Sequence, residues 1–584
     1  MNVIAGFLRR TPACSDDPPP ALLAARMCAA AAPGLPVSAF AEDGLAIAIA
    51  SADDTPAPVW DTAGDIGLIL DSQDGDTRAG ALVAEWARLG PAALRPLGGP
   101  FRAVFIDRRH REVTLCNDRH GLGRVFVHES PDRLLFATSV RALLALLPRP
   151  GRLDPRGLAE YLALGCVLQD RTIFAGIRTL PPGSAWSLTP AGRVRPARHF
   201  TPTSWESRGA LPADEYNLRL FEEFPAALER CLGDATDTGL SLTGGLDSRA
   251  VLAWSSDRRL PCYTFGGPLR DCADVTIARR VATACGCPHT TLRLGAAFFT
   301  DFERLAAEAV IASDGELDVS GAAEVHLNRA ARTIAGCRLT GNYGSEILRG
   351  HVALRPQRID PTLLLPEYRR LAREAEETLR QEKATDPLTF IAFKQMPWLH
   401  RGRFAVERSE LLPRTPFLDP ALVSLAYQAP PDLRGSAEPL LRLIAARSPR
   451  LAEIPSDRGL RYPPRPVLTQ ATRLWRETTA RAEYVWDYGM PRWLAPIERR
   501  LRGMHPERLF LGRHKFCHFR LWYREPLAPI VRELLGGFEA PGFVPGATDR
   551  VIREHLSGRV NRTREIHQLL SLRLIEREIL QTNG

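Results

Sequence analysis

The segment that most constrains this fold is an apolar strand that runs directly into a glycine pair and then into a helix. It reads LSLTGGLDSR over residues 240–249. Glycines let backbone amides approach an anion closely, and the hydroxyls of Thr243 and Ser248, with the positive end of the following helix, complete an anion cradle. The Walker ending Gly-Lys-Ser/Thr is absent. Asp247 fits such a cradle if a metal bridges it to phosphates; the alternative is a plain turn with a helix N-cap.

Strand-length apolar segments alternate with helical segments around this cradle. Strands are predicted at 238–242, 261–265, 290–294 and 338–340, and helices at 215–233, 249–257 and 273–285. This alternation is typical of a parallel sheet wrapped by crossover helices. Beyond residue 302 the pattern is mainly helical, and it ends in a charged amphipathic helix or helix pair over 549–580.

The first 200 residues follow a different pattern. Short strands separated by turns are predicted at 45–51, 66–71, 103–107, 113–117, 124–128 and 134–137, with helices at 81–89 and 140–147. This predicts a sheet-rich α+β domain. The stretch 200–208 turns polar and predicts a linker, so we divide the chain into domains 1–203 and 204–584.

Length and composition indicate a multidomain globular protein without a membrane span. A chain of 584 residues is too long for one compact domain, and 45% hydrophobic with 24% charged residues is ordinary for globular proteins. No apolar run approaches the roughly 20 residues that span a bilayer, and Arg9 and Arg10 follow the apolar N-terminal stretch instead of preceding it as in a secretory signal. We therefore expect a cytoplasmic protein without a membrane partner.

The net charge of +9 comes from scattered arginines, since the only lysines are Lys383, Lys394 and Lys515. No aromatic-basic motif accompanies them, so no nucleic-acid partner is expected. Eleven cysteines without a repeated spacing predict reduced thiols, not a metal site.

Residues 243–248, Thr-Gly-Gly-Leu-Asp-Ser, resemble the PP-loop signature Ser-Gly-Gly-x-Asp-Ser of the asparagine synthetase family. Further stretches resemble that family in order along nearly the whole chain: 97–105, 117–121, 135–139, 174–183 and 414–419. The resemblance implies an α/β protein: an Ntn-like α+β sandwich, similar to glutamine-amidotransferase domains, followed by a PP-loop (adenine nucleotide alpha hydrolase-like) parallel-sheet domain with a helical C-terminal part. Family members convert a carboxylate to an acyl-adenylate, from which an amine displaces AMP.

The resemblance implies ATP and Mg²⁺ as cofactors and places residues around them. The implied nucleotide-binding residues are Leu242, Thr243, Gly244, Gly245, Asp247, Ser248, Phe265, Asp274, Thr340 and Gly341. Among them, the resemblance implies that Asp247 is also a magnesium ligand, that the backbones of Leu242 and Phe265 face the adenosine, and that Thr340-Gly341 lies beside the ribose. Asp274 stands where the family has a Glu near the metal or the nucleotide; a first-turn helix acid is the alternative.

The second motif, Thr-Gly-Asn-Tyr-Gly-Ser-Glu over 340–346, departs from asparagine synthetases and resembles the Tyr-Gly-Ser-Asp stretch of β-lactam synthetase. That resemblance implies that Glu346 is a second magnesium ligand and that Tyr343 is a base or proton relay. Another alignment gives the latter role to Asn342. A Tyr with an ordinary pKa near 10 needs a partner acid to act as a base, and a packed core tyrosine is the alternative.

The family places a catalytic Lys after the segment that 414–419 resembles, and here Arg458, in the loop 454–460, stands at about that position. Arginine neutralises pyrophosphate bidentately but does not give up a proton near neutral pH. We therefore predict charge stabilisation by Arg458, with a surface-loop arginine as the alternative.

The N-terminal domain departs from glutamine-hydrolysing relatives, in which a Cys follows the initiator Met. This sequence begins Met1-Asn2, its first cysteine is Cys14, and Leu70-Asp71-Ser72 replaces the glutamine-holding Asn-Gly. Without nucleophile and clamp, we predict no glutaminase activity. The domain then serves as a scaffold or as a substrate-docking surface.

Three functions fit these features. We favour an ATP-dependent ligase that joins a substrate carboxylate to an amine of the substrate, closing a lactam or macrolactam ring as in β-lactam synthetase, carbapenam synthetase or lasso-peptide cyclases. Its partners are a peptide or small-molecule carboxylate, with a maturation protease or leader-binding protein. The alternatives are an ammonia-dependent amidotransferase acting on aspartate or on a glycan or small-molecule carboxylate, and a catalytically inactive nucleotide-binding module. Retention of both Asp247 and Glu346 argues against the inactive module.

Overall fold

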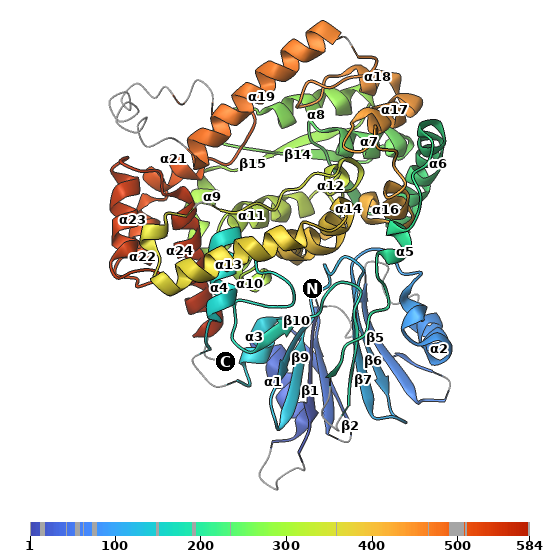
Figure 1. Cartoon of the computed structure of the whole chain (residues 1–584), viewed down its shortest axis with the longest axis vertical. Coiled ribbons are helices and arrows are strands. Elements are labelled where there is room, and N and C mark those ends of the chain that lie inside the picture. The colour runs from blue at the N-terminus through green and yellow to red at the C-terminus, as the bar shows by residue number, and fades with distance from the viewer. Residues whose placement is uncertain are drawn as a thin grey trace.

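The computed structural model describes residues 2–11, 18–42, 44–52, 59–61, 63–72, 79–147, 151–189, 194–233, 235–357, 359–464, 466–489, 507 and 511–581. Met1 and Cys14, which enter the glutaminase prediction, lie outside this set. The N-terminal part contains two antiparallel sheets, blue to cyan in Figure 1. The strands of the first sheet lie in the order β10 (Ile177–Thr179), β8 (Phe126–Glu129), β9 (Arg133–Ala137), β1 (Val3–Arg9), β3 (Leu45–Ala50), β2 (Val37–Glu42). Those of the second follow the order β12 (Val194–Arg195), β11 (Ala185–Leu188), β7 (Glu112–Asn117), β6 (Phe101–Asp107), β5 (Ile66–Ser72), β4 (Val59–Trp60).

Alternating side chains hold these sheets together, because successive strand residues face opposite sides. On β1, Ile4 and Leu8 join the core shared with Ile69 of the second sheet, whereas Val3 and Phe7 join the core that packs under α1 (Pro20–Ala31). Helix α2 (Ala79–Leu89) covers the other face of the second sheet. The result is a helix–sheet–sheet–helix sandwich, in agreement with the predicted α+β class.

Strand β1 is absent from the predicted strands although it lies inside the first sheet. Both of its faces are buried, so it lacks the apolar–polar alternation that marks a half-exposed strand. The predicted linker is a further correction. Residues Thr203–Glu206 form α5, and Trp205 packs against Phe200 with ring centroids 4.6 Å apart, so this stretch is docked against the protein.

The third sheet is parallel and has the strand order β15 (His289–Arg293), β14 (Cys262–Gly266), β13 (Thr238–Ser241), β16 (Cys337–Thr340), β17 (Leu412–Arg414). Four of its strands are predicted from the sequence; the three-residue β17 is not. The adjoining helices are α6 (Ala213–Leu232), α7 (Leu246–Ser255), α8 (Ala273–Ala284), α10 (Phe302–Ala312) and α11 (Gly321–Arg332). The boundary near residue 203 stays a prediction.

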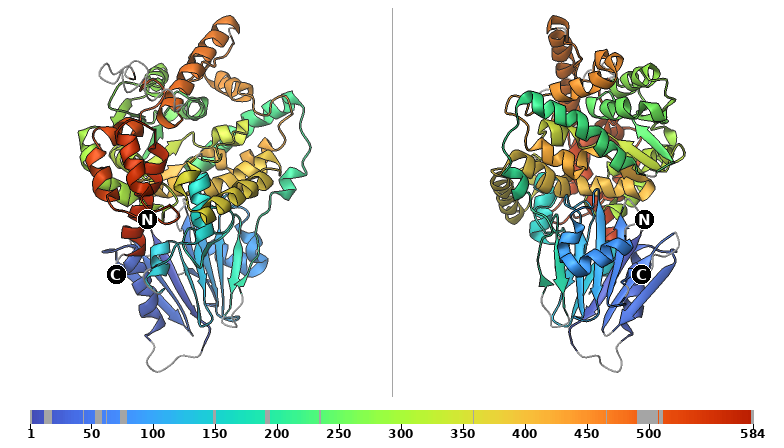
Figure 2. Two further views of the ribbon diagram at one scale, coloured as in Figure 1. Left: turned by 60° about the vertical axis from the view of Figure 1, so that its left-hand side comes forward. Right: turned by 90° about the vertical axis from the view of Figure 1, so that its right-hand side faces the viewer.

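The rest of the chain is mainly helical, as predicted (Figures 1 and 2). Its elements are α9 (Ala296–Thr300), α12 (Gly344–Arg349), α13 (Pro366–Glu382), α14 (Pro387–Phe390), the π-helix η5 (Ile391–His400), α15 (Arg401–Glu410), α16 (Pro420–Ala426), α17 (Glu438–Arg447), α18 (Pro449–Glu453), α19 (Pro466–Tyr488), α21 (Phe519–Arg524), α22 (Ala528–Leu535), α23 (Ala547–Leu556) and α24 (Thr563–Ile575). None of the described helices is long and apolar enough to cross a membrane.

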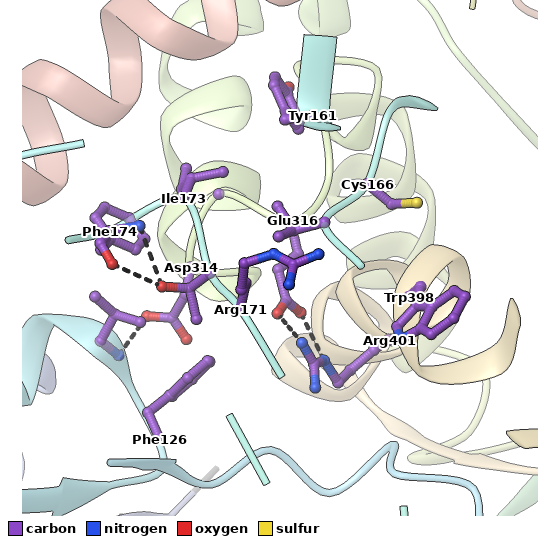
Figure 3. Close-up of a pocket in the computed structure, with 14 residues that line it drawn as sticks. Phe126, Tyr161, Cys166, Arg171, Ile173, Phe174, Asp314, Glu316, Trp398 and Arg401 are labelled. Carbon is purple, nitrogen blue, oxygen red and sulfur yellow. Dashed lines mark hydrogen bonds and ion pairs between the residues drawn. The ribbon is translucent and has the colours of Figure 1, made fainter. Parts of the chain in front are cut away.

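A polar seam joins the sandwich to the parallel-sheet part (Figure 3). Asp314, in the loop between α10 and α11, accepts hydrogen bonds from Ser139 Oγ and from the Val140 amide, both at 2.9 Å. Arg401, at the start of α15, is paired with Glu316 and donates to Thr179 Oγ1 at 2.9 Å. These buried contacts fix α15 relative to both parts of the molecule.

Candidate functional site

The strand order of the parallel sheet places its site between β13 and β16. The chain leaves β13 toward β14 and β15 on one side, and β16 and β17 lie on the other. Ligands of open α/β sheets bind outside the carboxyl ends of the strands at such a switch point. The glycine loop follows β13 and Thr340-Gly341 ends β16, so the two motifs predicted from the sequence meet there.

Hydroxyl groups brace the glycine loop. The backbone amide of Thr243 donates to Ser248 Oγ at 3.1 Å, the two hydroxyls lie 3.0 Å apart, and the amide of Gly245 donates to Thr243 Oγ1 at 3.2 Å. Arg249, which is fully buried, donates to the carbonyl of Gly244 at 3.3 Å and to that of Ile454. The loop is therefore held in one shape before any ligand arrives.

The position of Asp274 agrees with both of its sequence interpretations, a first-turn helix acid and a residue beside the glycine loop. It lies in the first turn of α8, and its Oδ1 accepts a hydrogen bond of 2.8 Å from the amide of Gly244. Burial, together with the nearby charge of Asp457, raises the pKa of Asp274 to about 6. The hydrogen bond from Gly244 favours the ionised carboxylate and partly offsets that rise in pKa.

Glycines allow the second motif to touch the first. A Cβ on Gly341 would lie 2.3 Å from the backbone nitrogen of Ser248, and one on Gly344 would lie 2.7 Å from the carboxyl carbon of Asp247. A side chain at Gly341 would therefore displace the backbone of the glycine loop, and one at Gly344 would displace the Asp247 carboxylate. The close approach brings α12 directly against the acid of the cradle.

The acids of the site gather around Asp247. Its carboxylate accepts hydrogen bonds of 2.8 Å from Ser345 Oγ and of 2.8 and 3.1 Å from Arg349. Burial raises the pKa of Asp247, and Asp457 raises it further; burial likewise raises the pKa of Glu346, and Asp247 adds to it. Arg349 partly offsets the rise in the pKa of Asp247. Buried carboxylates with raised pKa values favour a cation beside them.

This donor set fits magnesium bound together with phosphates. Among the described residues, no three His, Cys, Asp or Glu side chains are grouped closely enough to hold a metal by themselves. Mg²⁺ is usually held by one or two carboxylates together with waters and substrate phosphates. Asp247 and Glu346 match that pattern, and both belong to the set implied by the resemblance.

Tyr343 is buried and has a charged neighbour that the sequence does not reveal. Its backbone is left-handed with φ 72°, its ring contacts His400 edge-on at 5.6 Å, and only 8% of the residue is exposed. Burial and then the charge of Glu407 raise the pKa of Tyr343 well above its ordinary value. Tyr343 is therefore a neutral phenol at physiological pH.

Glu407, on α15, is the acid that the sequence interpretation lacked. It is 2% exposed, and its Oε1 lies 3.4 Å from Asn342 Nδ2 and 3.5 Å from Arg338 Nη1. Burial raises its pKa, and Arg338 partly offsets the rise. Asn342, Tyr343 and Glu407 line one small cavity. The two alignments of the second motif, which assign the proton-relay role to Tyr343 or to Asn342, therefore both place a polar side chain in this cavity.

The loop of Arg458 docks on the glycine loop. The amide of Asp457 donates to the Gly244 carbonyl at 3.0 Å. The side chain of Arg458 is 61% exposed, and its Nε lies 3.6 Å from the Asp457 carboxylate. Arg458 is thus an exposed cation next to the cradle, a position compatible with both of its sequence interpretations.

Two further predicted residues belong to the strands beside the glycine loop: Leu242 follows β13, and Phe265 lies on β14. Leu242 is buried in the core, and its carbonyl accepts a hydrogen bond of 2.7 Å from Thr264 Oγ1. The ring of Phe265 lies 4.9 Å from the guanidinium of Arg338. The residues at this site that the sequence reasoning missed are Arg349, Glu407 and Asp457.

In the N-terminal domain, the position that replaces the glutamine clamp is filled by ion pairs. Asp71 is 7% exposed and pairs with Arg102 on the adjacent strand β6 and with Arg408 of α15, the latter at 2.5 Å. Burial favours a higher pKa for Asp71, but Arg102 and Arg408 outweigh it, and the net pKa is lowered. The contact also ties the sandwich to the helix that carries Glu407.

Comparison with known proteins gives matches for both the N-terminal part and the parallel-sheet part of the chain. Residues 72–200 match the family model of the glutamine amidotransferase domain, and residues 219–446 match that of asparagine synthase. Among curated proteins of Bacillus subtilis (strain 168), asparagine synthetase [glutamine-hydrolyzing] 3 is 27% identical over 176 residues, which is 29% of this chain and 28% of that protein. Asparagine synthetase [glutamine-hydrolyzing] 1 is 20% identical over 219 residues, 36% of this chain and 33% of that one. The alignments thus span about a third or less of the relatives' length.

Two solved structures match this chain distantly. The glutamine phosphoribosylpyrophosphate amidotransferase of B. subtilis complexed with ADP and GMP matches with 9% identity and a TM-score of 0.25, over 50% of this chain and 90% of that one. An allosteric regulatory enzyme of purine biosynthesis matches with 10% identity and a TM-score of 0.25, over 76% of this chain and 91% of that one. The two family models and the curated relatives agree in supporting the asparagine synthetase family, with the asparagine synthase model over residues 219–446 and the glutamine amidotransferase model over 72–200.

Proposed function

We propose that this protein is an ATP-dependent carbon–nitrogen ligase that adenylates a substrate carboxylate and joins it to an amine of the same substrate. The observation that carries the proposal is the convergence, at one switch point, of the glycine loop, the acids Asp247 and Glu346, and the buried neighbours Tyr343 and Glu407. The match to the asparagine synthase model supports the reaction class.

In the first step, a carboxylate oxygen attacks the α-phosphorus of ATP, and the bond to the bridging oxygen breaks to release pyrophosphate. The glycine loop would bind the phosphates, and Ser248 and Arg458 would stabilise the departing charge. Asp247 and Glu346 would hold Mg²⁺, which supplies charge neutralisation to the phosphate oxygens. Arg349, which pairs with Asp247, is an additional cation at this place.

In the second step, the amine nitrogen attacks the acyl carbon, AMP leaves, and the amine loses a proton. We assign that proton to Tyr343, which passes its own phenolic proton to Glu407, because a buried phenol with a raised pKa cannot ionise by itself. The raised pKa of Glu407 suits it to accept a proton near neutral pH. Asn342 bonds to Glu407 and positions it.

The amine is assigned to the substrate because the glutamine clamp position is taken by the ion pairs of Asp71. Proximity then favours ring closure over hydrolysis. We therefore propose lactam or macrolactam formation in specialised peptide metabolism of the lasso type, in the cytoplasm, with a maturation protease or leader-binding protein as partner. The absence of glutaminase activity is part of this proposal.

One observation favours ammonia as the alternative amine. The small cavity beside Tyr343 and Glu407 is also lined by Gly99 and Pro100 of the N-terminal domain. A molecule as small as ammonia fits this small cavity better than a substrate side chain does. An ammonia-dependent amidotransferase acting on aspartate or another small carboxylate is therefore the second candidate.

The test determines whether the nitrogen of the new amide bond comes from the substrate or from ammonia. Purified protein is incubated with MgATP, ¹⁵N-ammonium and a panel of aspartate, β-amino acids and candidate precursor peptides. The masses of the products are then measured by mass spectrometry. We expect a product lighter by one water and free of ¹⁵N. Incorporation of ¹⁵N would establish the ammonia-dependent reaction, and glutamate released from added glutamine would contradict the loss of glutaminase activity.

A further inference from the structure

A cavity of about 370 Å³ lies away from the glycine loop, between the N-terminal domain and the helical part. Its volume is within the range of small-molecule sites. Its N-terminal wall includes Arg119, Arg198 and Phe200, and its other wall includes Phe393 and Trp398 of η5. None of the residues assigned to ATP or magnesium lines it. This cavity is therefore separate from the proposed reaction centre.

Aromatic side chains make the apolar surface of this cavity. The rings of Phe200 and Phe393 lie 5.4 Å apart and tilted by 40°, and Trp205 packs behind both. The larger ring of Trp398 also lines the cavity. A planar aromatic body is the ligand shape that such a surface binds best, because offset and tilted ring contacts add to the hydrophobic gain.

The acids that line the cavity are already satisfied within the protein. Glu382 pairs with Lys394 at 2.7 Å and accepts a hydrogen bond of 3.0 Å from Gln169. Asp170 lies 3.7 Å from Arg178. These groups neutralise one another along one side of the cavity, so the described lining offers no free acid to a cationic ligand.

The arginines of the N-terminal wall lack such partners. Arg198 is exposed and makes no side-chain hydrogen bond or ion pair with any described residue. Arg119 is 6% exposed, its two terminal nitrogens donate to the carbonyls of Leu97 and Arg95, and its Nε has no hydrogen-bond partner in the part of the chain that the structure describes. No carboxylate of a described residue directly contacts either guanidinium. Asp118 and Asp419 lie near enough to Arg119 to favour its charged form, so the positive charge that this wall offers to a ligand is that of Arg198.

From this charge and shape, we propose that the interdomain cavity is a binding site for a small organic anion with a planar aromatic body. The rings of Phe200, Phe393 and Trp398 hold the body, and Arg198 pairs with the anionic group. Because the walls belong to both parts of the chain, the ligand bridges them. The same π-helix ends at His400, whose ring contacts Tyr343, so the site adjoins an element of the reaction centre.

The test uses 1-anilinonaphthalene-8-sulfonate, a fluorescent aromatic anion, titrated against the full chain. N-phenyl-1-naphthylamine has the same aromatic body without the sulfonate and serves as the uncharged probe. We expect saturable binding of the anion at one site per chain, about tenfold weaker binding of the uncharged probe, and no displacement by excess MgATP.

Variants locate the site. Arg198→Glu should weaken binding of the anionic probe about tenfold or more, and Arg198→Lys should retain it. Arg195→Glu is the matched control, since Arg195 is exposed on the neighbouring β12 and does not line the cavity. Equal affinity of Arg198→Glu and wild type, equal affinity for both probes, or displacement by MgATP would overturn the proposal. These outcomes are independent of whether the protein forms amides.

Discussion

Asp71→Asn removes a carboxylate from a buried ion cluster that joins the two parts of the chain. The carboxylate pairs with Arg102 and Arg408, and the three side chains are 5–11% exposed. Removing one partner of a buried pair costs about 3–5 kcal/mol, because it leaves the other charges uncompensated. Asparagine keeps the shape of the side chain, so we expect a loss of this size in the free energy of unfolding to come from charge alone.

The same cluster sets a pH dependence. Although burial favours a higher pKa, Arg102 and Arg408 lower the pKa of Asp71 below its ordinary value of 3.8. The stabilisation is therefore complete above the pKa of the unfolded carboxyl, about 4. It is lost as the pH falls through the lower pKa of the folded protein. Asp71→Asn should be correspondingly less sensitive to acid over that range.

Urea unfolding followed by circular dichroism measures both effects. The control is Glu42→Gln, which breaks the pair with Arg108, whose partners are 42% and 37% exposed. Surface pairs of this kind contribute little to stability. The reasoning is refuted if Asp71→Asn shifts the urea midpoint no more than Glu42→Gln does, or if its stability keeps the acid dependence of the wild type.

Three further predictions concern the reaction centre. Gly344→Ala places a Cβ 2.7 Å from the carboxyl carbon of the cradle aspartate and should lower ATP–pyrophosphate exchange about a hundredfold; Gly209→Ala, where nothing lies within 4 Å, should not change the rate. Because burial raises the pKa of Asp274 to about 6, its ionisation destabilises the fold above that pH. Stability should therefore rise as the pH falls through about 6 toward about 4, the pKa of the unfolded carboxyl, and a urea-midpoint series on Asp274→Asn should lose that rise. Tyr343→Phe and Glu407→Gln should retain exchange and lose amide formation by about a hundredfold or more, and equal loss of both steps would contradict their assignment to the second.

The sequence predicts the parallel sheet because β13 to β16 are short apolar runs separated by helices. It fails at β1, whose burial on both faces removes the alternation that identifies a strand, and at β17, whose three residues Leu-Pro-Arg carry no strand signal. It also treats residues 200–208 as a linker, since their polar composition hides the packing of Trp205.

Local motifs place the glycine loop and the second motif, but not their long-range partners. Glu407 bonds to Asn342 across 65 residues of sequence, and no local pattern marks it. Asp457 reaches Gly244 only because its loop folds back over the cradle. Arg349 could have been found, because it lies four residues after Ser345 and therefore on the same face of one helix.

ATP–pyrophosphate exchange tests the central claim most directly. The protein is assayed with magnesium and the panel of acids, and compared with Asp247→Ala. The account predicts exchange that depends on one acid of the panel and is lost in the variant, because Asp247 lies at the meeting point of both motifs. Formation of ADP and phosphate instead of AMP and pyrophosphate, or exchange that persists in Asp247→Ala, would contradict it.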